Sequence, residues 1–141
     1  MANFKTTIIR KTRQQIVKQQ YAASARQIVG RAGDLVRNTA ITSIQSGAKS
    51  GIVYEKYSPR RSHRASAAGQ PPATDTGNLV SNIVKRVDGN GLGVDVQSRA
   101  VYSEALEFGT STMAARPFLQ PALEANRPKI RALEAQLFKA K

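Results

Sequence analysis

The sequence contains no cysteine and no tryptophan, and aromatic residues make up 6% of its 141 positions. The absence of cysteine excludes disulfides, thiolate metal sites and thiol nucleophiles. Because aromatic residues are scarce, Ile, Val, Leu and Ala must form the core, and we expect neighbouring subunits to complete part of the hydrophobic surface. A chain of this length can bury one modest core, so we expect a single domain over residues 1–141.

Long apolar runs are also absent. The first residues, MANFKTTIIRKTRQQ, lack the continuous apolar stretch of a signal peptide. No segment approaches the roughly 20 apolar residues of a membrane span. We therefore expect a soluble, unprocessed protein with no membrane partner.

Acidic residues are few, with nine Asp and Glu against 22 Lys and Arg, which gives a net charge of +13. Residues 1–72 carry 13 basic and two acidic residues, a net charge of +11, whereas residues 73–141 carry nine and seven, a net charge of +2. This asymmetry favours a polyanionic partner for the first half, either nucleic acid or an acidic protein surface. There is no zinc-finger spacing or aromatic RNA-binding pattern, so sequence-specific recognition has little support.

The order of the patterns predicts an α+β fold that begins with a long helix over residues 7–46 and stops at Gly47. Gly30 and Gly33 predict a bend or a close helix contact. The helix is expected to bury a stripe at seven-residue spacing and the stripe beside it: Tyr21, Ile28 and Leu35, with Ala25, Ala32 and Thr39. Its basic side chains are either solvated or face an acidic partner or DNA, and the candidates for DNA contact are Arg10, Lys11, Arg13 and Lys18.

The run IVYEKY, residues 52–57, alternates as a strand does. Residues 58–75 are rich in Pro, Ser, Gly and Ala, so we expect a long extended loop, a basic arm that carries Arg60, Arg61 and Arg64. This arm is suited to contact with a neighbouring subunit or with DNA, and a flexible surface loop is the alternative. His63 has no second histidine or acidic cluster nearby, so we expect neither metal binding nor catalysis there.

Asp75 or Thr76 is predicted to cap a short helix at GNLVSN. The turn Asp88-Gly89-Asn90-Gly91 then predicts an antiparallel hairpin near residues 83–97. A short helix over VYSEALEFG is expected to end at Gly109, and a C-terminal helix to follow, with Pro117 near its first turn and an irregular beginning caused by Pro121 and Pro128. Its apolar side is expected to consist of Phe118, Leu119, Leu123, Ile130, Leu133, Leu137 and Phe138.

Three motifs in a fixed order resemble a known family. SAAGQPPATDTGNLVSNI, then LEFGT, then ARPFLQPAL are similar to small tailed-bacteriophage neck proteins, the head-tail connector or tail-completion family of HK-type siphophages. The similar region covers residues 50–125. The chain reads AGQPP where the family often has a Pro-Gly-x-x-Pro step.

The resemblance implies a structural virion protein that forms a ring in the neck, at the junction of head and tail, around the DNA channel. It implies a homo-oligomer, with six copies favoured and twelve as the alternative, assembled in the host cytoplasm between the head connector and the tail terminator or tail-tube proteins. Nonspecific contact with genomic DNA fits this role, and no cofactor is expected. The expected assembly contacts are Arg60, Arg61, Arg64, Thr76, Gly77, Leu79, Glu107, Phe108, Gly109, Arg116, Pro117 and Phe118.

Two other classes of function, an enzyme and a DNA-compacting protein, compete with this interpretation. Glu104 and Glu107, three residues apart on one helical face, are the strongest candidates for acid-base catalysis, but no third polar group accompanies them. We therefore expect a protein that is not an enzyme, with Leu106 and Phe108 in the core and Glu107 paired with Arg116 or with a neighbour's arginine. The alternative is a nonspecific DNA-binding or DNA-compacting protein, which would explain the charge.

Overall fold

The computed structural model describes the backbone of residues 2–139 and the side chains of residues 15–137 and 139. Its elements are α1 (Ala2–Ser46), β1 (Val53–Tyr57), β2 (Arg60–Arg64), α2 (Asn78–Ser81), β3 (Ile83–Val87), β4 (Val94–Ser98), α3 (Ser103–Phe108) and α4 (Leu119–Lys139). The predicted α+β class is confirmed. The side chains of Arg10, Lys11, Arg13 and Phe138 lie outside the described residues. No helix of the described part has the length and apolar character needed to cross a membrane.

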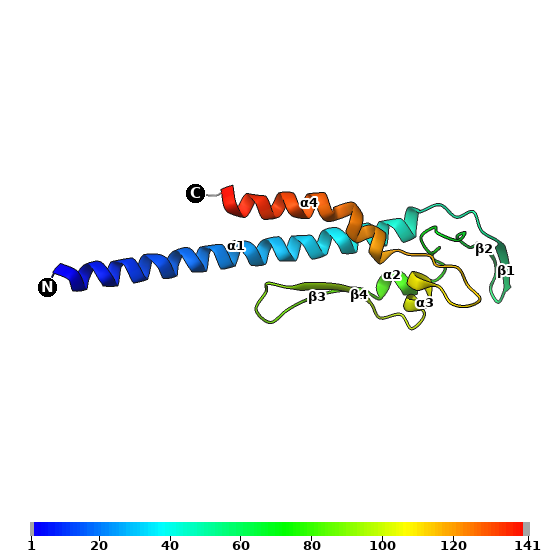
Figure 1. Cartoon of the computed structure of the whole chain (residues 1–141). Coiled ribbons are helices and arrows are strands. Elements are labelled where there is room, and N and C mark those ends of the chain that lie inside the picture. The colour runs from blue at the N-terminus through cyan, green and yellow to red at the C-terminus, as the bar shows by residue number, and fades with distance from the viewer. Residues whose placement is uncertain (1, 140–141) are drawn as a thin grey trace.

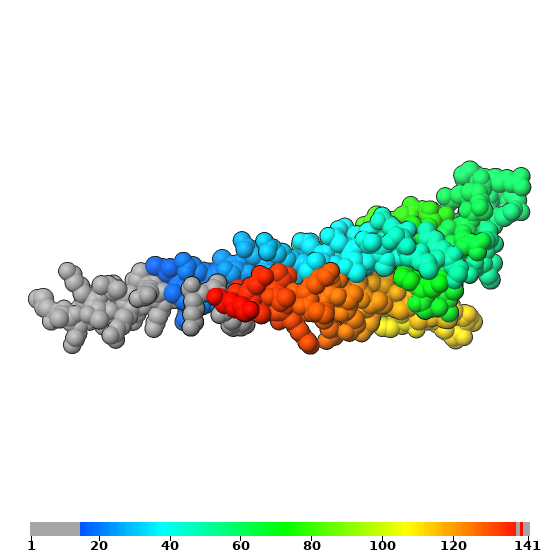
Figure 2. Space-filling view, turned by 90° about the horizontal axis from the view of Figure 1, so that it is seen from above, coloured from blue at the N-terminus to red at the C-terminus, as the bar shows by residue number. Residues whose placement is uncertain are grey.

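The long helix α1 is the axis of the molecule (Figure 1). The C-terminal helix α4 runs antiparallel along one side of α1, and the β3–β4 hairpin lies along another side. The first part of α1 extends past the C-terminal end of α4 (Figure 1), and the β1–β2 hairpin projects at the opposite end of the molecule (Figures 1 and 2). The molecule is therefore elongated, with a packed middle and two projecting ends.

The buried side of α1 differs from the predicted seven-residue stripe. Ala32, Val36, Ala40 and Ile44 are buried, at a spacing of four residues that places them on one side of a helix. Tyr21, which was expected in the core, is 47% exposed, so the predicted stripe is correct at Ala32 and wrong at this residue. The stripe fails there because Tyr21 lies beside the C-terminal end of α4, where it lines an open groove of about 720 Å³ together with Gln136 and Leu137. The helix ends at Ser46, as expected.

The core gathers around Phe118, which is 1% exposed. The side chains that pack with it come from α1, α2, β3, α4 and the segment before α3, so one aromatic ring joins elements that are far apart in the sequence. The other buried members of this cluster are Val36, Ala40, Ile44, Leu79, Ile83, Ala100 and Ala122. Apart from Phe118 they are aliphatic, as the composition predicted.

A buried amide fixes α4 against α1. Asn126 is 1% exposed, and its Nδ2 donates to Thr39 Oγ1 at 2.8 Å and to the carbonyl oxygen of Ala122 at 2.8 Å. A buried amide without partners would cost about 1–3 kcal/mol, so these bonds favour one register of the two helices. The apolar side of α4 is narrower than predicted, since Leu123 is 39% exposed.

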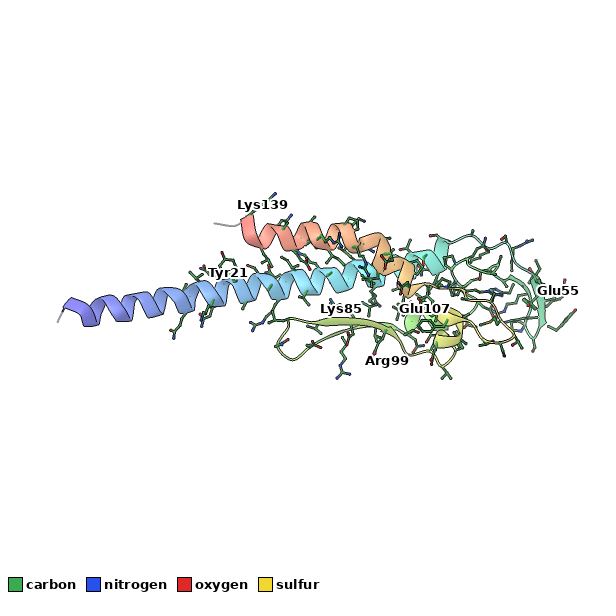
Figure 3. The ribbon with its side chains drawn as sticks, in the orientation of Figure 1. Tyr21, Glu55, Lys85, Arg99, Glu107 and Lys139 are labelled. Atoms are coloured by element: carbon green, nitrogen blue, oxygen red, sulfur yellow. The ribbon has the colours of Figure 1, made fainter. Side chains whose placement is uncertain are left out.

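The predicted hairpin is confirmed, with β3 and β4 paired antiparallel from Ile83 opposite Ser98 to Val87 opposite Val94. It is fastened to α1 by polar contacts. Arg37 Nε donates to the carbonyl oxygen of Ile83 at 2.9 Å, and Lys85 Nζ lies 2.7 Å from Asp34 Oδ1. Figure 3 shows Lys85 between the hairpin and α1.

Gly33 allows the hairpin to approach α1 closely. A Cβ atom at this position would lie 2.6 Å from Val94 Cγ2 and 2.7 Å from Lys85 Cδ. The predicted close contact is therefore present, but its partner is a sheet and not a helix. Gly30 has open space where a Cβ would lie.

The C-terminal helix begins at Leu119, two residues after Pro117, and is continuous to Lys139. Pro121 lies in the first turn, where a backbone N–H has no intrahelical partner to lose. Pro128 is inside the helix. Figure 1 shows α4 change direction after its first turns, so the irregularity expected from the prolines is a bend and not a break.

We predict that Phe118→Ala lowers the free energy of unfolding by about 3–5 kcal/mol, because it leaves a cavity at the centre of the core. Phe108→Ala is the matched control, since Phe108 is 77% exposed and its loss should change stability by no more than about 0.5 kcal/mol. Denaturant unfolding of the monomer measures both. Equal losses in the two variants would contradict the assignment of the core.

Candidate assembly site

The acidic and aromatic stretch before α4 forms a helix cap. Glu107, in α3, accepts hydrogen bonds from backbone N–H groups eleven, twelve and thirteen residues later: Oε2 from Phe118 at 2.9 Å and Leu119 at 3.0 Å, and Oε1 from Gln120 at 2.8 Å. A carboxylate at the N-terminus of a helix satisfies orphan donors and complements the helix dipole. Figure 3 shows Glu107 where α3 meets the start of α4.

The expected ion pair between Glu107 and Arg116 is not formed. Both carboxylate oxygens of Glu107 face the start of α4, and Arg116 is instead held through its backbone N–H, which donates to the carbonyl oxygen of Leu106 at 2.6 Å. The guanidinium Nε of Arg116 is buried without a hydrogen-bond partner among the described residues. The backbone N–H groups at the start of α4 take the place of Arg116 as partners of the Glu107 carboxylate, because α3 and the start of α4 lie side by side.

The turn between the two helices depends on Gly109. The short helix α3 ends at Phe108, as predicted, and Gly109 has φ 77°, a value that L side chains rarely adopt. A Cβ at this position would also lie 2.8 Å from the carbonyl oxygen of Met113. The prediction that Phe108 belongs to the core is wrong, because the end of α3 directs it away from the cluster that contains Leu106.

In the segment DTGNL, the helix α2 begins without the side-chain cap that was predicted. Gly77 is the N-cap, with φ 77°, and no side chain caps the helix, so the predicted cap by Asp75 or Thr76 is wrong. The left-handed turn that Gly77 permits takes the place of a side-chain cap. Leu79 is 5% exposed and belongs to the core.

The predicted extended arm over residues 58–75 is only partly a loop. Arg60–Arg64 forms β2, which pairs antiparallel with β1 from Tyr57 opposite Arg60 to Val53 opposite Arg64. The strand forms because β1 provides the pairing partner, although the composition of RRSHR gives no alternating apolar signal. Arg60, Arg61 and Arg64 are exposed, as an interaction arm requires.

Asp75 holds one face of this hairpin. Lys56 donates a hydrogen bond to its carboxylate, Arg61 Nη2 lies 3.4 Å away and His63 Nδ1 lies 3.8 Å away. The hydrogen bond from Lys56, aided by the charges of Arg61, Lys56 and His63 and opposed by desolvation, lowers the pKa of Asp75. Sequence reasoning missed this role, although Asp75 is the single acidic residue between Glu55 and Asp88.

The three motifs meet at one pocket. It has a volume of about 280 Å³ and is lined by residues of DTGNL, of LEFGT and of ARPFLQPAL, together with His63 of β2. Four of the expected assembly residues lie in its wall: Thr76, Gly77, Leu79 and Arg116. The expected residues on β2 and the exposed Lys18 on α1 lie outside this wall.

A second hollow lies beside the cap. This groove, of about 530 Å³, runs between α1, β4, α3 and α4 and includes Glu107 and Phe108 in its lining. Two further carboxylates, Asp95 and Glu104, line it as well. We call it the acidic groove, because these three acids are its charged residues and no Lys or Arg lines it. Sequence reasoning did not find it, since four separate elements form it.

Comparison with known proteins gave no match: no family model, no curated protein and no solved structure is similar to the chain.

We predict that Glu107→Gln lowers the free energy of unfolding by about 1–2 kcal/mol, because an amide offers one acceptor oxygen to three donors and has no charge. Glu104→Gln is the matched control, with an expected change within about 0.5 kcal/mol, since Glu104 is exposed. Chemical denaturation of the monomer distinguishes the two. A stable Glu107→Gln protein would show that the cap does not hold α4.

We also predict that Asp75→Asn loosens the β1–β2 hairpin without unfolding the body, because its contacts join the hairpin to the loop before α2. Hydrogen exchange should become faster across residues 53–64, while the melting temperature changes little. Asp95→Asn, an exposed carboxylate on β4, is the control and should leave exchange in the hairpin unchanged. Unchanged exchange in Asp75→Asn would contradict this role.

The lowered pKa of Asp75 predicts a pH dependence. The hairpin contacts are complete above the ordinary carboxyl pKa of about 3.9 and are lost as the pH falls through the lower value of the folded protein. The amide NMR signals of Arg61 and His63, which contact Asp75, should therefore shift in that acidic range more in the wild type than in Asp75→Asn. Identical titrations would contradict the assignment.

Proposed function

We propose that this protein is a structural subunit of a ring in the neck of a tailed bacteriophage, at the junction of head and tail, around the channel through which DNA passes. The observation that carries the proposal is the share of the fold that extends beyond its small core. The first part of α1 and the β1–β2 hairpin both project from the packed middle (Figure 1). Such segments are typical of subunits that are completed by neighbours.

Beside the C-terminal end of α4, α1 exposes apolar side chains close together. Ile16 is 48% exposed, Val17 is 40% exposed and Tyr21 is 47% exposed. A helix gains most of its stability in a protein from packing an apolar side against another element. A neighbouring subunit in a ring would supply that element.

The β1–β2 hairpin is similarly incomplete. Its five β1 residues are all exposed, with Tyr57 at 76%. A two-stranded hairpin is marginally stable alone, and its free edges offer unpaired backbone groups to another chain. The hairpin is thus suited to contact with an adjacent subunit or an adjacent ring.

The meeting of three motifs at one pocket supports the resemblance on which the neck role rests. Segments from residues 74–79, Leu106 and Arg116 are separated in the sequence but line a common wall. A shared structural role explains why these motifs occur together. The head connector on one side and the tail terminator or tail tube on the other are the proposed partners, and the location is the virion neck after assembly in the host cytoplasm.

The proposed ring is built from identical heterologous contacts, which close when the rotation between subunits allows it. Six copies are favoured and twelve are the alternative. The net charge of +13 permits contact with phosphates inside the channel without reading bases. The same charge favours the second candidate, a nonspecific DNA-compacting protein.

The solution state of the purified protein tests the proposal. We expect closed rings of uniform size without DNA, seen by electron microscopy and by light scattering at physiological salt. The variant Val17→Ser with Tyr21→Ser should lose the rings but keep the melting temperature of the subunit, because these side chains lie outside the core.

Free subunits that form no rings and are retained on random duplex DNA, with a steep dependence on salt, would contradict the neck role. That result would favour DNA compaction.

A further inference from the structure

The β1–β2 hairpin has two faces with different surroundings. Directly opposed residues of an antiparallel pair lie on the same face, so Lys56, Arg61 and His63 share one face, the face that contacts Asp75. The other face presents Val53, Glu55 and Tyr57 with their partners Arg64, Ser62 and Arg60. These six residues are all exposed, so this outer face is available to a partner.

The outer face combines apolar and basic groups. Tyr57 is 76% exposed, Val53 is 44% exposed, and each lies opposite an arginine. Glu55, the one acid of this face, accepts a hydrogen bond from the Tyr57 hydroxyl at 3.3 Å. A surface that fits the outer face would therefore be apolar with acidic residues at its margin.

The acidic groove has this character. Its apolar lining includes Val94, Val96 and Leu123, and Phe108 lies in its wall with 77% of its surface exposed. Asp95 and Glu104 are exposed, so they can pair with incoming cations, although Asp95 also lies opposite Arg86 of β3. This is a local excess of acid in a chain with 22 basic and nine acidic residues. Charge complementarity of this kind steers association and fixes its register.

The groove also presents a strand edge. All five residues of β4 line it, and β4 pairs with β3 on one side in its two-stranded sheet. A strand that enters the groove can add to this sheet by backbone hydrogen bonds. An occupant made of strands therefore fits better than a helix.

The occupant comes from a different copy of the chain. The hairpin projects at one end of the molecule (Figures 1 and 2), where Asp75 and the hydrogen bonds between Gly51, Ala65 and Ile52 fix its base. Among the element pairs in extensive contact, β1 and β2 contact each other and no other element of the described chain. The hairpin thus remains free for a neighbour.

We infer that the outer face of the β1–β2 hairpin binds in the acidic groove of the next copy, with Arg60 and Arg64 beside Asp95 and Glu104 and with Tyr57 against the apolar wall. The contact joins two different surfaces, so each subunit donates one hairpin and receives another. This inference rests on the proposed function, because the contact between hairpin and groove would be the repeating contact of the ring. Repetition gives a closed ring or an open filament, according to the rotation between copies.

Disulfide trapping tests the contact, since the chain has no cysteine of its own. Tyr57→Cys and Phe108→Cys proteins are purified separately, mixed at physiological salt and oxidised mildly. We expect mixed disulfide dimers between the two variants, and few dimers in either variant alone. The inference would be overturned if no disulfide formed between Tyr57→Cys and Phe108→Cys in the mixture, or if disulfide dimers formed only between two Tyr57→Cys subunits. Trapping of Phe108→Cys by Tyr21→Cys instead would show that α1 is the occupant.

Charge reversal is the second measurement. Arg60→Glu with Arg64→Glu should weaken self-association roughly a hundredfold, because like charges then face each other. Adding Asp95→Arg and Glu104→Arg should restore it. Lys129→Glu with Arg131→Glu, an equal change of charge on exposed positions of α4, is the control and should have little effect.

The two proposals fail in different ways. Closed rings that form without mixed disulfides and are insensitive to the Arg60 and Arg64 reversal would overturn this contact and leave the neck role standing. Mixed disulfides in open chains or in dimers, with no ring, would support the contact and contradict the ring.

Discussion

The capping of α4 by Glu107 sets where that helix begins and brings Phe118 into the core. One carboxylate accepts three backbone N–H groups at the start of that helix, and the first of them belongs to Phe118. The cap therefore places the central aromatic ring of the core and sets where α4 begins. From that point Asn126 holds α4 against α1. A single acidic side chain thus connects α3, the core and the helix pair.

The core that results is small and lies toward the C-terminal end of α1. Ala32 is the first buried residue of α1 along the described side chains, and Ile44 is the last. The hairpin β3–β4 covers the same stretch through Gly33 and Arg37. What remains of α1, together with the β1–β2 hairpin, has no place in this core. Nearer its N-terminus, α1 leaves Val17 and Tyr21 exposed beside the end of α4, and this open apolar surface is the physical basis of the proposed ring.

Much of the fold could be predicted because its signals are local. Gly47 ends α1, the Asp-Gly-Asn-Gly turn joins β3 to β4, and Gly109 follows α3. Each depends on backbone preferences of a few adjacent residues.

The remaining features depend on distant partners. The strand β2 forms because β1 pairs with it and Asp75 contacts it, and the sequence RRSHR predicts neither of these contacts. Glu107 was expected to pair with an arginine, and its backbone partners could not be predicted, because a carboxylate that caps a helix eleven residues away resembles any exposed acid in the sequence. The acidic groove is formed by four elements and has no sequence signal of its own.

Cryo-electron microscopy of the neck of intact tailed particles that contain this protein tests the proposed neck role. We expect a ring at the head-tail junction into which the α1–α4 pair and the β3–β4 hairpin fit, with the β1–β2 hairpin of each copy reaching the next. A neck whose density is fully explained by other chains, with this protein bound to the packaged DNA or absent from the particle, would contradict it.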